Sequence, residues 1–144
     1  MAGVLFLMTA LNLTPAAAQD YKIGNIELSG LSARAMLPGA KVGGAYLTII
    51  NHGNEDDRLI SISSDRASPV QIHEMKIDNG VMTMRELKAG ITIPAGQTVT
   101  LKPGGYHLMF MNVTQPFRKG ETVKAKLTFE KAGAIELELP VGTP

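Results

Sequence analysis

The feature that most constrains this chain is a series of short β-forming segments, each followed by a turn. From residue 20 onward, no window of about a dozen residues shows the 3.6-residue apolar period of an amphipathic helix. Clusters of turn-forming residues interrupt the segments, for example Asn51-His52-Gly53-Asn54 and Asp78-Asn79-Gly80. Because Asn-Gly tolerates positive φ, the second cluster predicts a hairpin between residues 70–75 and residues 81–87.

The spacing of the turns predicts the fold class. About eight or nine short strands, with turns about ten residues apart, are typical of an antiparallel sandwich or barrel. Residues 90–101 are expected to form two short strands around a turn, and residues 122–130 and 134–141 a last hairpin. The 15 glycines and 8 prolines supply the corners. No repeat or linker divides the chain, so we expect one all-β domain.

The first 18 residues have the pattern of an export signal. Residues 4–13 are almost all apolar, and this run is too short to span a bilayer as a mature helix. Ala16 and Ala18 then fit the small-residue rule of a signal-peptidase site, although no Lys or Arg precedes the apolar run. We therefore expect residues 1–18 to be a signal peptide and residues 19–144 an exported domain without stable membrane insertion. A buried N-terminal helix or strand is the alternative.

The composition excludes several classes of function. There are 14 Lys and Arg against 13 Asp and Glu, the net charge is +1, and aromatic residues make up 5% of the chain. We therefore expect neither nucleic acid nor an anionic membrane surface as a partner. The chain has no cysteine. Disulfides, thiolate zinc sites, iron–sulfur clusters and blue-copper centres are all excluded for that reason.

No enzyme motif is apparent, and we expect a protein without enzymatic activity. The chain has no G-x-S-x-G motif and no glycine-rich phosphate loop before a helix. Glu74 follows His73 directly and would face the opposite side of a regular strand, so the two do not form an acid–base pair. The acidic run Glu55-Asp56-Asp57 is expected to be a solvated loop.

The histidines and methionines are distributed unevenly. Beyond the leader, five of the six methionines flank two of the three histidines, in His73-Glu74-Met75, Met82-Thr83-Met84 and His107-Leu108-Met109-Phe110-Met111. Residues two apart on a strand share a face, so His107 and Met109 would present an imidazole and a thioether side by side, with Met111 continuing that face. The Asn79-Gly80 turn would bring His73 near Met84. A third strand holding His107 and Met109 would complete a four-ligand cluster.

This donor set selects the metal. Thioethers are soft ligands that favour Cu(I), whereas imidazole suits several transition metals, so the mixed set points to Cu(I) above Zn(II). Any one strand methionine taken alone would be expected to fill the core, and a lone histidine to be structural. The coincidence of both residue types therefore supports the hypothesis. Met36 has no partner in the sequence, and His52 is expected to be solvated. Met75 and Met82 are expected to pack rather than to act as auxiliary ligands.

These residues resemble the periplasmic copper chaperones of the PCuAC family. The family signature is a His, ten residues, a Met, a gap one residue shorter than the one here, and then His-x-Met. In this chain ten residues separate His73 from Met84, and 22 separate Met84 from His107-Leu108-Met109. The segment Pro103-Gly104-Gly105, which is also typical of the family, lies just before His107-Leu108-Met109. Leu31 occupies a position where the family often has Trp. The resemblance spans nearly all of residues 22–142.

The resemblance implies a cupredoxin-like β-barrel in the periplasm, with Cu(I) held by His73, Met84, His107 and Met109. It also implies delivery of the ion to the dinuclear copper centre of a respiratory oxidase, with oxidase subunit II or a Sco-type protein as the copper-accepting partner. The residues alone leave alternatives open. These are copper sequestration or resistance without a dedicated acceptor, a metal-free interaction module, and an electron-transfer cupredoxin, which the lack of Cys disfavours.

Overall fold

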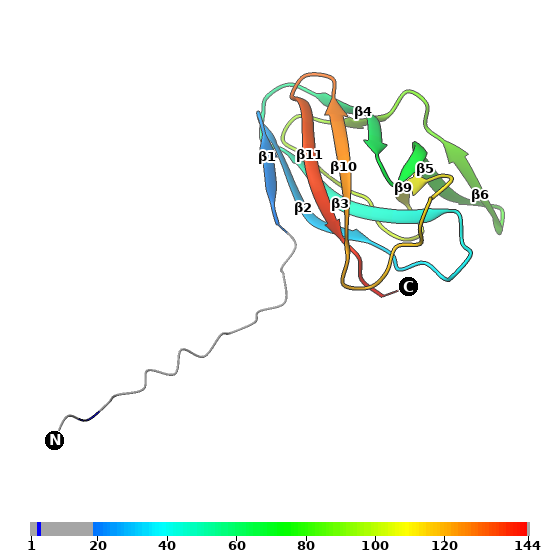
Figure 1. The fold of residues 1–144 in the computed structure, drawn as a ribbon. Helices are drawn as coiled ribbons and strands as arrows, with labels where there is room; N and C mark the ends of the chain where they lie inside the picture. The colour runs from blue at the N-terminus through cyan, green and yellow to red at the C-terminus, as the bar shows by residue number, and fades with distance from the viewer. Residues whose placement is uncertain (1–2, 4–18, 144) are drawn as a thin grey trace.

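The computed structural model describes Gly3 and residues 19–143, which form eleven β-strands and no helix (Figure 1). The all-β expectation is confirmed, with more strands than the eight or nine expected. The signal peptide expected over residues 1–18 lies outside the described residues, apart from Gly3. The strands are β1 (Tyr21–Ile23), β2 (Ile26–Ala33), β3 (Gly43–Asn51), β4 (Asp57–Ser64), β5 (Ala67–Asp78), β6 (Val81–Glu86), β7 (Ile91–Ile93), β8 (Thr98–Thr100), β9 (Tyr106–Phe110), β10 (Thr122–Phe129) and β11 (Gly133–Pro140).

The described strands belong to one antiparallel sheet that curls into a nearly closed barrel (Figure 1). The main path runs β1-β2-β3-β9-β5-β4-β10-β11, while β6 pairs with β5, β7 with β4 and β8 with β3. The two ends of the path meet where Ala33 of β2 forms a parallel bridge with Val141. At this point the Gly142 amide donates a hydrogen bond to the Ala33 carbonyl at 2.9 Å.

The structure refines two of the strands expected from the sequence. The first expected strand is split into β1 and β2 by a tight turn at Gly24, whose φ of 55° suits glycine and interrupts a continuous strand. The two short strands within residues 90–101 are present as β7 and β8, but they pair with β4 and β3 and not with each other. The final hairpin, β10 with β11, is confirmed in full register from Thr122 to Phe129.

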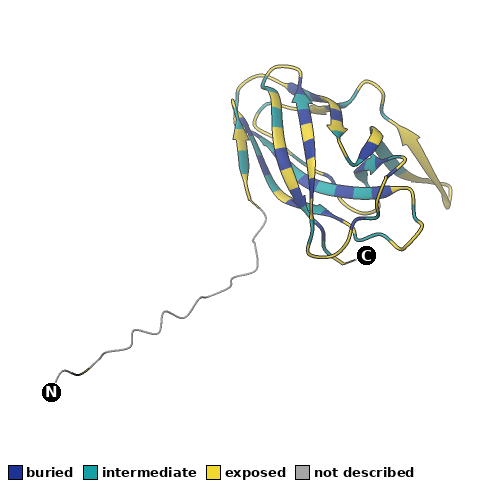
Figure 2. Cartoon of the chain, in the orientation of Figure 1, coloured by how far each residue is buried: buried dark blue, intermediate teal, exposed yellow. Residues whose placement is uncertain are grey.

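The core follows from the period-2 alternation of the strands. Buried and half-buried residues alternate along the whole of β3, and buried residues alternate with exposed or half-buried ones along β10 (Figure 2). Phe110 and Phe117 are fully buried and meet edge to face, with ring centroids 5.4 Å apart. Leu31, at the position where the PCuAC family often has Trp, is also buried in this core.

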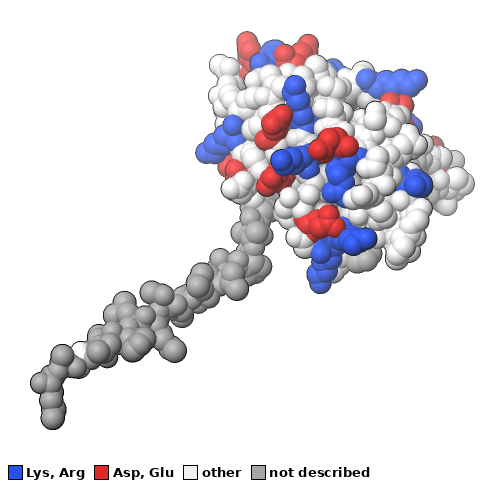
Figure 3. Space-filling model, in the orientation of Figure 1, with Lys and Arg blue, Asp and Glu red and all other residues white. Residues whose placement is uncertain are grey.

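The outer surface over β10 and β11 has charges of both signs. Figure 3 shows Lys and Arg interspersed with Asp and Glu on this face. The cross-strand neighbours Lys124 and Glu138, and Lys126 and Glu136, are opposite charges at paired positions. No basic stripe forms on this face, in keeping with the net charge of +1. Within the described part of the chain, no helix is long and apolar enough to cross a membrane.

One hairpin projects from the barrel. The β5–β6 hairpin extends beyond the other strands, and every residue of β6 is exposed (Figures 1 and 2). Its turn contains Asn79 with φ of 50° and Gly80 with φ of 76°, which is the positive-φ pair expected for an Asn-Gly hairpin turn. The turn fixes the register of β5 against β6, and therefore the placement of the candidate ligands.

Candidate metal centre

The four predicted ligands lie on one face of three adjacent strands. His73 of β5 stands directly opposite His107 of β9, with ring centroids 5.7 Å apart. Met84 of β6 stands opposite Met75, which is two residues from His73. Met109 is two residues from His107 on β9. Directly opposed residues and residues two apart share a face of a sheet, so the structure places all four predicted side chains together.

A hollow of about 550 Å³ opens beside this face. Met84, His107 and Met109 line it, together with Met75 and Met36. Its other wall is formed by the segment between β2 and β3 and by the start of β3. His73 is outside the lining and adjoins it through His107, its direct cross-strand neighbour.

A hydrogen bond to one ring nitrogen of His107 leaves the other nitrogen with a lone pair for a metal. The residue is only 5% exposed, and its Nδ1 lies 3.1 Å from the Gly105 carbonyl oxygen. A carbonyl oxygen only accepts hydrogen bonds, so Nδ1 is the donor and the neutral ring keeps its lone pair on Nε2. Metal-bound histidines commonly donate their second ring N–H to a carbonyl in this way, because the bond fixes the tautomer and the ring orientation.

His73 has a buried nitrogen without a hydrogen-bond partner. Its Nε2 donates to Oε1 of Gln71 at 2.8 Å, which leaves the lone pair on Nδ1. This Nδ1 is buried and has no partner among the described residues. Burial lowers the pKa of His73 below its ordinary value of 6.5, the neighbouring His107 lowers it further, and Glu86 partly opposes both. The imidazole is therefore held neutral, which is the form that binds metal.

The donor chemistry fits a soft monovalent ion. No group of three or more His, Cys, Asp or Glu residues capable of holding a metal occurs within the described residues. Two neutral imidazoles and several thioethers are grouped instead. Thioethers favour Cu(I), and an unsatisfied buried lone pair such as Nδ1 of His73 costs free energy until a ligand takes it. The residues present therefore fit Cu(I).

Sequence reasoning missed the place of Met36. This methionine lines the hollow, packs against the core, and accepts a hydrogen bond from the Phe117 amide at 3.5 Å through its sulfur. The segment between β2 and β3 brings Met36 to the site from far away in the sequence, and no local pattern signals this. Met36 nevertheless has a structural contact that the other methionines of the hollow lack.

Met111 does not continue the ligand face within a strand. Met111 was expected to continue the face of His107 and Met109, but their strand, β9, ends at Phe110, and Asn112 turns the chain with φ of 50°. The Met111 amide bonds to the Pro69 carbonyl at 2.9 Å, and Met111 is not part of the lining of the hollow. Met82 lies farther out on the hairpin, opposite Ile77, and is 62% exposed.

Two further expectations about charged residues are confirmed. Glu74 faces away from His73 and bonds to Arg85 across the hairpin at 2.9 Å, so the two neighbours form no acid–base pair. His52 is exposed and hydrogen-bonds to Glu27 at 2.7 Å. This hydrogen bond is the main reason that the pKa of Glu27 is lowered.

The acidic run is not wholly a solvated loop. Asp57 begins β4 and is only 7% exposed. Its carboxylate accepts hydrogen bonds from the backbone amides of Arg58, Lys131 and Ala132. It therefore accepts hydrogen bonds from the backbone amides of the turn between β10 and β11. This is a long-range role that the sequence pattern does not reveal. Glu55 and Asp56 are exposed as expected.

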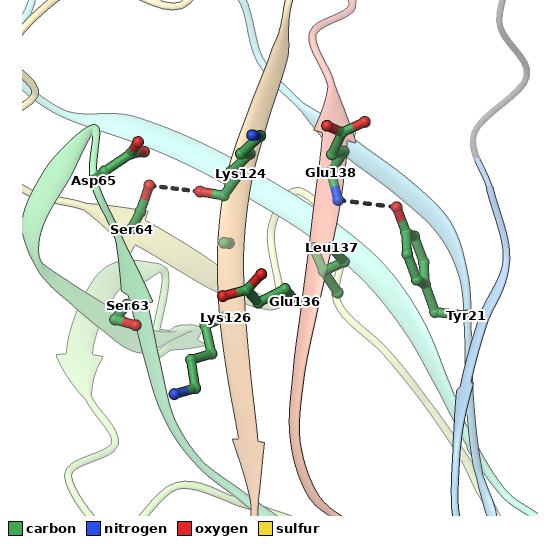
Figure 4. A pocket seen from close by; sticks show the side chains of 10 residues that line it. Tyr21, Ser63, Ser64, Asp65, Lys124, Lys126, Glu136, Leu137 and Glu138 are labelled. Carbon is green, nitrogen blue, oxygen red and sulfur yellow. Dashed lines mark hydrogen bonds between the residues drawn. The ribbon is translucent and has the colours of Figure 1, made fainter.

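A second hollow, of about 570 Å³, lies across β4, β10 and β11 (Figure 4). Its lining includes Lys124, Lys126, Glu136 and Glu138, with Tyr21 at one side, where the phenol oxygen accepts a hydrogen bond from the Glu138 amide at 3.0 Å. No histidine or methionine lines it. It therefore offers none of the soft donors found on the β5–β6–β9 face.

The sequence has recognisable relatives. A family model described as putative lipoprotein LpqE-like matches residues 26–141. Putative lipoprotein Lxx21020 of Leifsonia xyli subsp. xyli is 34% identical over 129 residues, covering 88% of this chain and 76% of the relative. The uncharacterized protein RP573 of Rickettsia prowazekii is 29% identical over 85 residues, covering 59% of this chain and 47% of the relative.

Solved structures share the fold. The copper-bound PCuAC domain from PmoF2 superposes with a TM-score of 0.75 at 27% identity, covering 88% of this chain and 99% of that domain. The solution structure of CuI-DR1885 from Deinococcus radiodurans gives a TM-score of 0.64 at 25% identity, covering 89% of this chain and 83% of that protein. The resemblance to PCuAC proteins is thereby confirmed, and this chain belongs to the LpqE-like family with the barrel of the PCuAC domains.

Proposed function

We propose that the protein binds one Cu(I) ion on the β5–β6–β9 face and passes it to an acceptor protein. The observation that supports this most is the buried, unpartnered Nδ1 of His73, one strand away from the oriented imidazole of His107. Two related structures, of the PmoF2 domain and of DR1885, are of copper-bound and Cu(I) forms. The chain has the same fold and a donor set suited to the same metal.

The proposed ligands are Nδ1 of His73, Nε2 of His107 and the sulfurs of Met84 and Met109. All four donors are neutral, so the site with its ion would have a charge of only +1, which a half-buried environment tolerates far better than a higher charge. Cu(I) is the cargo of the protein, and the proposed role is transport without catalysis. The imidazoles position the ion, and the thioethers select a soft one.

Delivery is supported by the exposure of the site. Met84 is 47% exposed on a hairpin that projects from the barrel, so an incoming ligand from another protein has access to this side. Following the family resemblance, the acceptor we propose is oxidase subunit II or a Sco-type protein. The matching family and one of the two relatives, Lxx21020, are named as putative lipoproteins, which supports an exported, periplasmic protein. Sequestration without an acceptor is the second candidate, because a single-ion site serves storage as well as transfer.

Competition with a Cu(I)-specific chelator tests the proposal. The domain covering residues 19–144 should show one tight Cu(I) site per chain and much weaker binding of Zn(II). Zn(II) binding as tight as that of Cu(I), or no Cu(I) binding, would contradict it. Mixing the Cu(I) form with copper-free subunit II or Sco-type protein then separates the two candidates. Transfer supports delivery, whereas copper retained by the domain against every acceptor favours sequestration.

A further inference from the structure

Met75 lies as close to the histidine pair in the sheet as the two predicted methionine ligands, Met84 and Met109, do. It is two residues from His73 on β5, directly opposite Met84 on β6, and diagonal to His107 on β9. These are the positions from which side chains on one face of a sheet make contact. The sequence had suggested that Met75 packs in the core, and the structure gives it another position.

The pairing of Met75 with Met84 is of the close type. The Leu87 amide bonds to the Ile72 carbonyl at 2.8 Å, so Ile72 and Leu87 form a hydrogen-bonded pair. Hydrogen-bonded and non-hydrogen-bonded pairs alternate along an antiparallel ladder, which makes Met75 and Met84 a non-hydrogen-bonded pair, with Cα atoms about 4.5 Å apart. In agreement, the Met75 amide points away from β6, toward the β9 side, and donates a hydrogen bond to the Gly105 carbonyl at 3.1 Å.

Met75 is not packed against the hydrophobic core formed by the described residues. Among the methionines of the hollow, Met36 packs against the core cluster, whereas Met75 belongs neither to that cluster nor to the residues packed against it. Both Met75 and Met84 line the hollow, and Met75 is the less exposed of the two. Exposure thus falls in steps from Met84 through Met75 to His107, which is buried.

We propose that Met75 and Met84 form a thioether pair that shares the copper ion, an inference that rests on the proposed function. As the bond from copper to the Met75 sulfur forms, the bond to the Met84 sulfur breaks. No proton or electron moves, and the ion stays Cu(I). With the exposed Met84 released, a ligand of the acceptor can approach the ion from that side while His73, His107, Met109 and Met75 still hold it.

A double-mutant cycle on Cu(I) affinity tests this sharing. Because each thioether can replace the other, Met75→Leu and Met84→Leu should each lower the affinity by only about tenfold, the low end for loss of a group that supports a metal. The double variant should lose more than the product of the two single losses. Met82→Leu is the matched control, since Met82 lies on the same hairpin outside the lining of the hollow. It should bind as the wild type does.

Methyl NMR of the methionines gives an independent measurement on the wild-type protein. Addition of Cu(I) should shift the ε-methyl signals of both Met75 and Met84 and leave that of Met82 in place. A Met75 signal that does not move, single losses that simply multiply in the double variant, or a loss confined to one of the two residues would overturn the sharing. In each case tight binding by the wild type would leave the proposed function intact. Absence of Cu(I) binding by the wild type would overturn both.

Discussion

At the scale of single residues, the structure separates methionines that face the site from methionines that support the fold. Met109 lies on the ligand face beside His107, whereas Met36 gives its sulfur to the Phe117 amide and packs on the core. Identical side chains therefore have different roles, set by their neighbours. Substitution by leucine, which nearly preserves volume and apolar character, distinguishes a lost sulfur from a lost contact.

Met109→Leu should lower Cu(I) affinity sharply because it removes a soft ligand. The free energy of unfolding of the copper-free protein should change by less than about 1.5 kcal/mol, since volume is nearly conserved. Chelator competition and urea unfolding measure the two quantities on the same sample. Met111→Leu is the control, because Met111 is half-buried outside the hollow, and it should leave copper affinity unchanged. Lost stability with copper affinity intact would place Met109 in the core instead.

Met36→Leu should have the opposite effect to Met109→Leu, lowering stability and leaving Cu(I) affinity nearly unchanged. The substitution removes the acceptor of the Phe117 amide and changes packing against the core, so the copper-free protein should lose about 1 kcal/mol of stability. Copper affinity should stay close to that of the wild type. Thermal unfolding and chelator competition test the two halves of this statement. A large loss of Cu(I) affinity with normal stability would show that Met36 is itself a ligand.

At the scale of elements, the β5–β6 hairpin sets the register that brings the donors together. Gly80 has φ of 76°, and a Cβ added there would meet nothing within 4 Å. Gly80→Ala therefore introduces backbone strain without a clash. It should lower the local stability of the hairpin by about 1 kcal/mol. It should also weaken Cu(I) binding by loosening the alignment of Met75 and Met84. Hydrogen exchange of the β6 amides measures the loosening directly.

Gly142→Ala is the matched control for the hairpin, because Gly142 has open space around it and no positive φ. It should change neither the exchange of β6 nor the copper affinity. Equal effects of the two substitutions would mean that the Asn79-Gly80 turn does not determine the geometry of the site. The exposed position of the hairpin predicts that the effect of Gly80→Ala stays local, with the core strands protected as in the wild type.

Local patterns in the sequence predicted the strands and turns better than they predicted which strands pair with each other. The Asn79-Gly80 turn and the alternation of β10 were recognisable because short-range chemistry determines them. The sequence placed the strand of His107 beside the hairpin only as a hypothesis, and it did not predict the direct pairing of His73 with His107. That pairing depends on β9 lying next to β5 across a long stretch of chain. The buried role of Asp57 and the place of Met36 depend on contacts more than seventy residues away, which no local pattern contains.

At the scale of the whole molecule, the free energy of unfolding depends on whether His73 is protonated. Burial, and then His107, lower the pKa of His73 below 6.5, with Glu86 opposing. Below pH 6.5 the unfolded chain takes up a proton at this position more readily than the folded protein does, so acid favours unfolding. The stability linked to neutral His73 is present above pH 6.5 and is lost as the pH falls through the lowered pKa of the folded state.

Urea unfolding of the copper-free protein between pH 7.5 and 5 should therefore show a loss of stability that His73→Ala reduces. His52→Ala removes an exposed imidazole far from the site and is the control, which should keep the His73 part of the loss. The pKa of Glu27 is lowered from 4.5, so its effect on stability falls at more acid pH, outside this window. A wild-type stability that stays constant over this range would contradict the buried, neutral state of His73.

The same protons compete with copper in the loaded protein. Imidazole binds metal only through a free lone pair, while the sulfurs of Met84 and Met109 do not titrate in this range. Cu(I) affinity should fall as the pH drops, and the lowered pKa of His73 should delay its share of the fall to more acid conditions. Once both imidazoles are protonated in the free protein, the slope should approach about two log units of affinity per pH unit.

Chelator competition from pH 7.5 to 5, on the wild type and on His73→Ala, measures these slopes. The variant has one competing imidazole fewer and should follow a shallower line, with the difference concentrated at the acid end, where neutral His73 is lost. The thioethers keep part of the affinity throughout, so the protein should release copper gradually and not at a threshold. A flat wild-type profile would remove both imidazoles from the copper site. Equal slopes for the two proteins would remove His73 alone and leave its buried Nδ1 without a ligand to satisfy it.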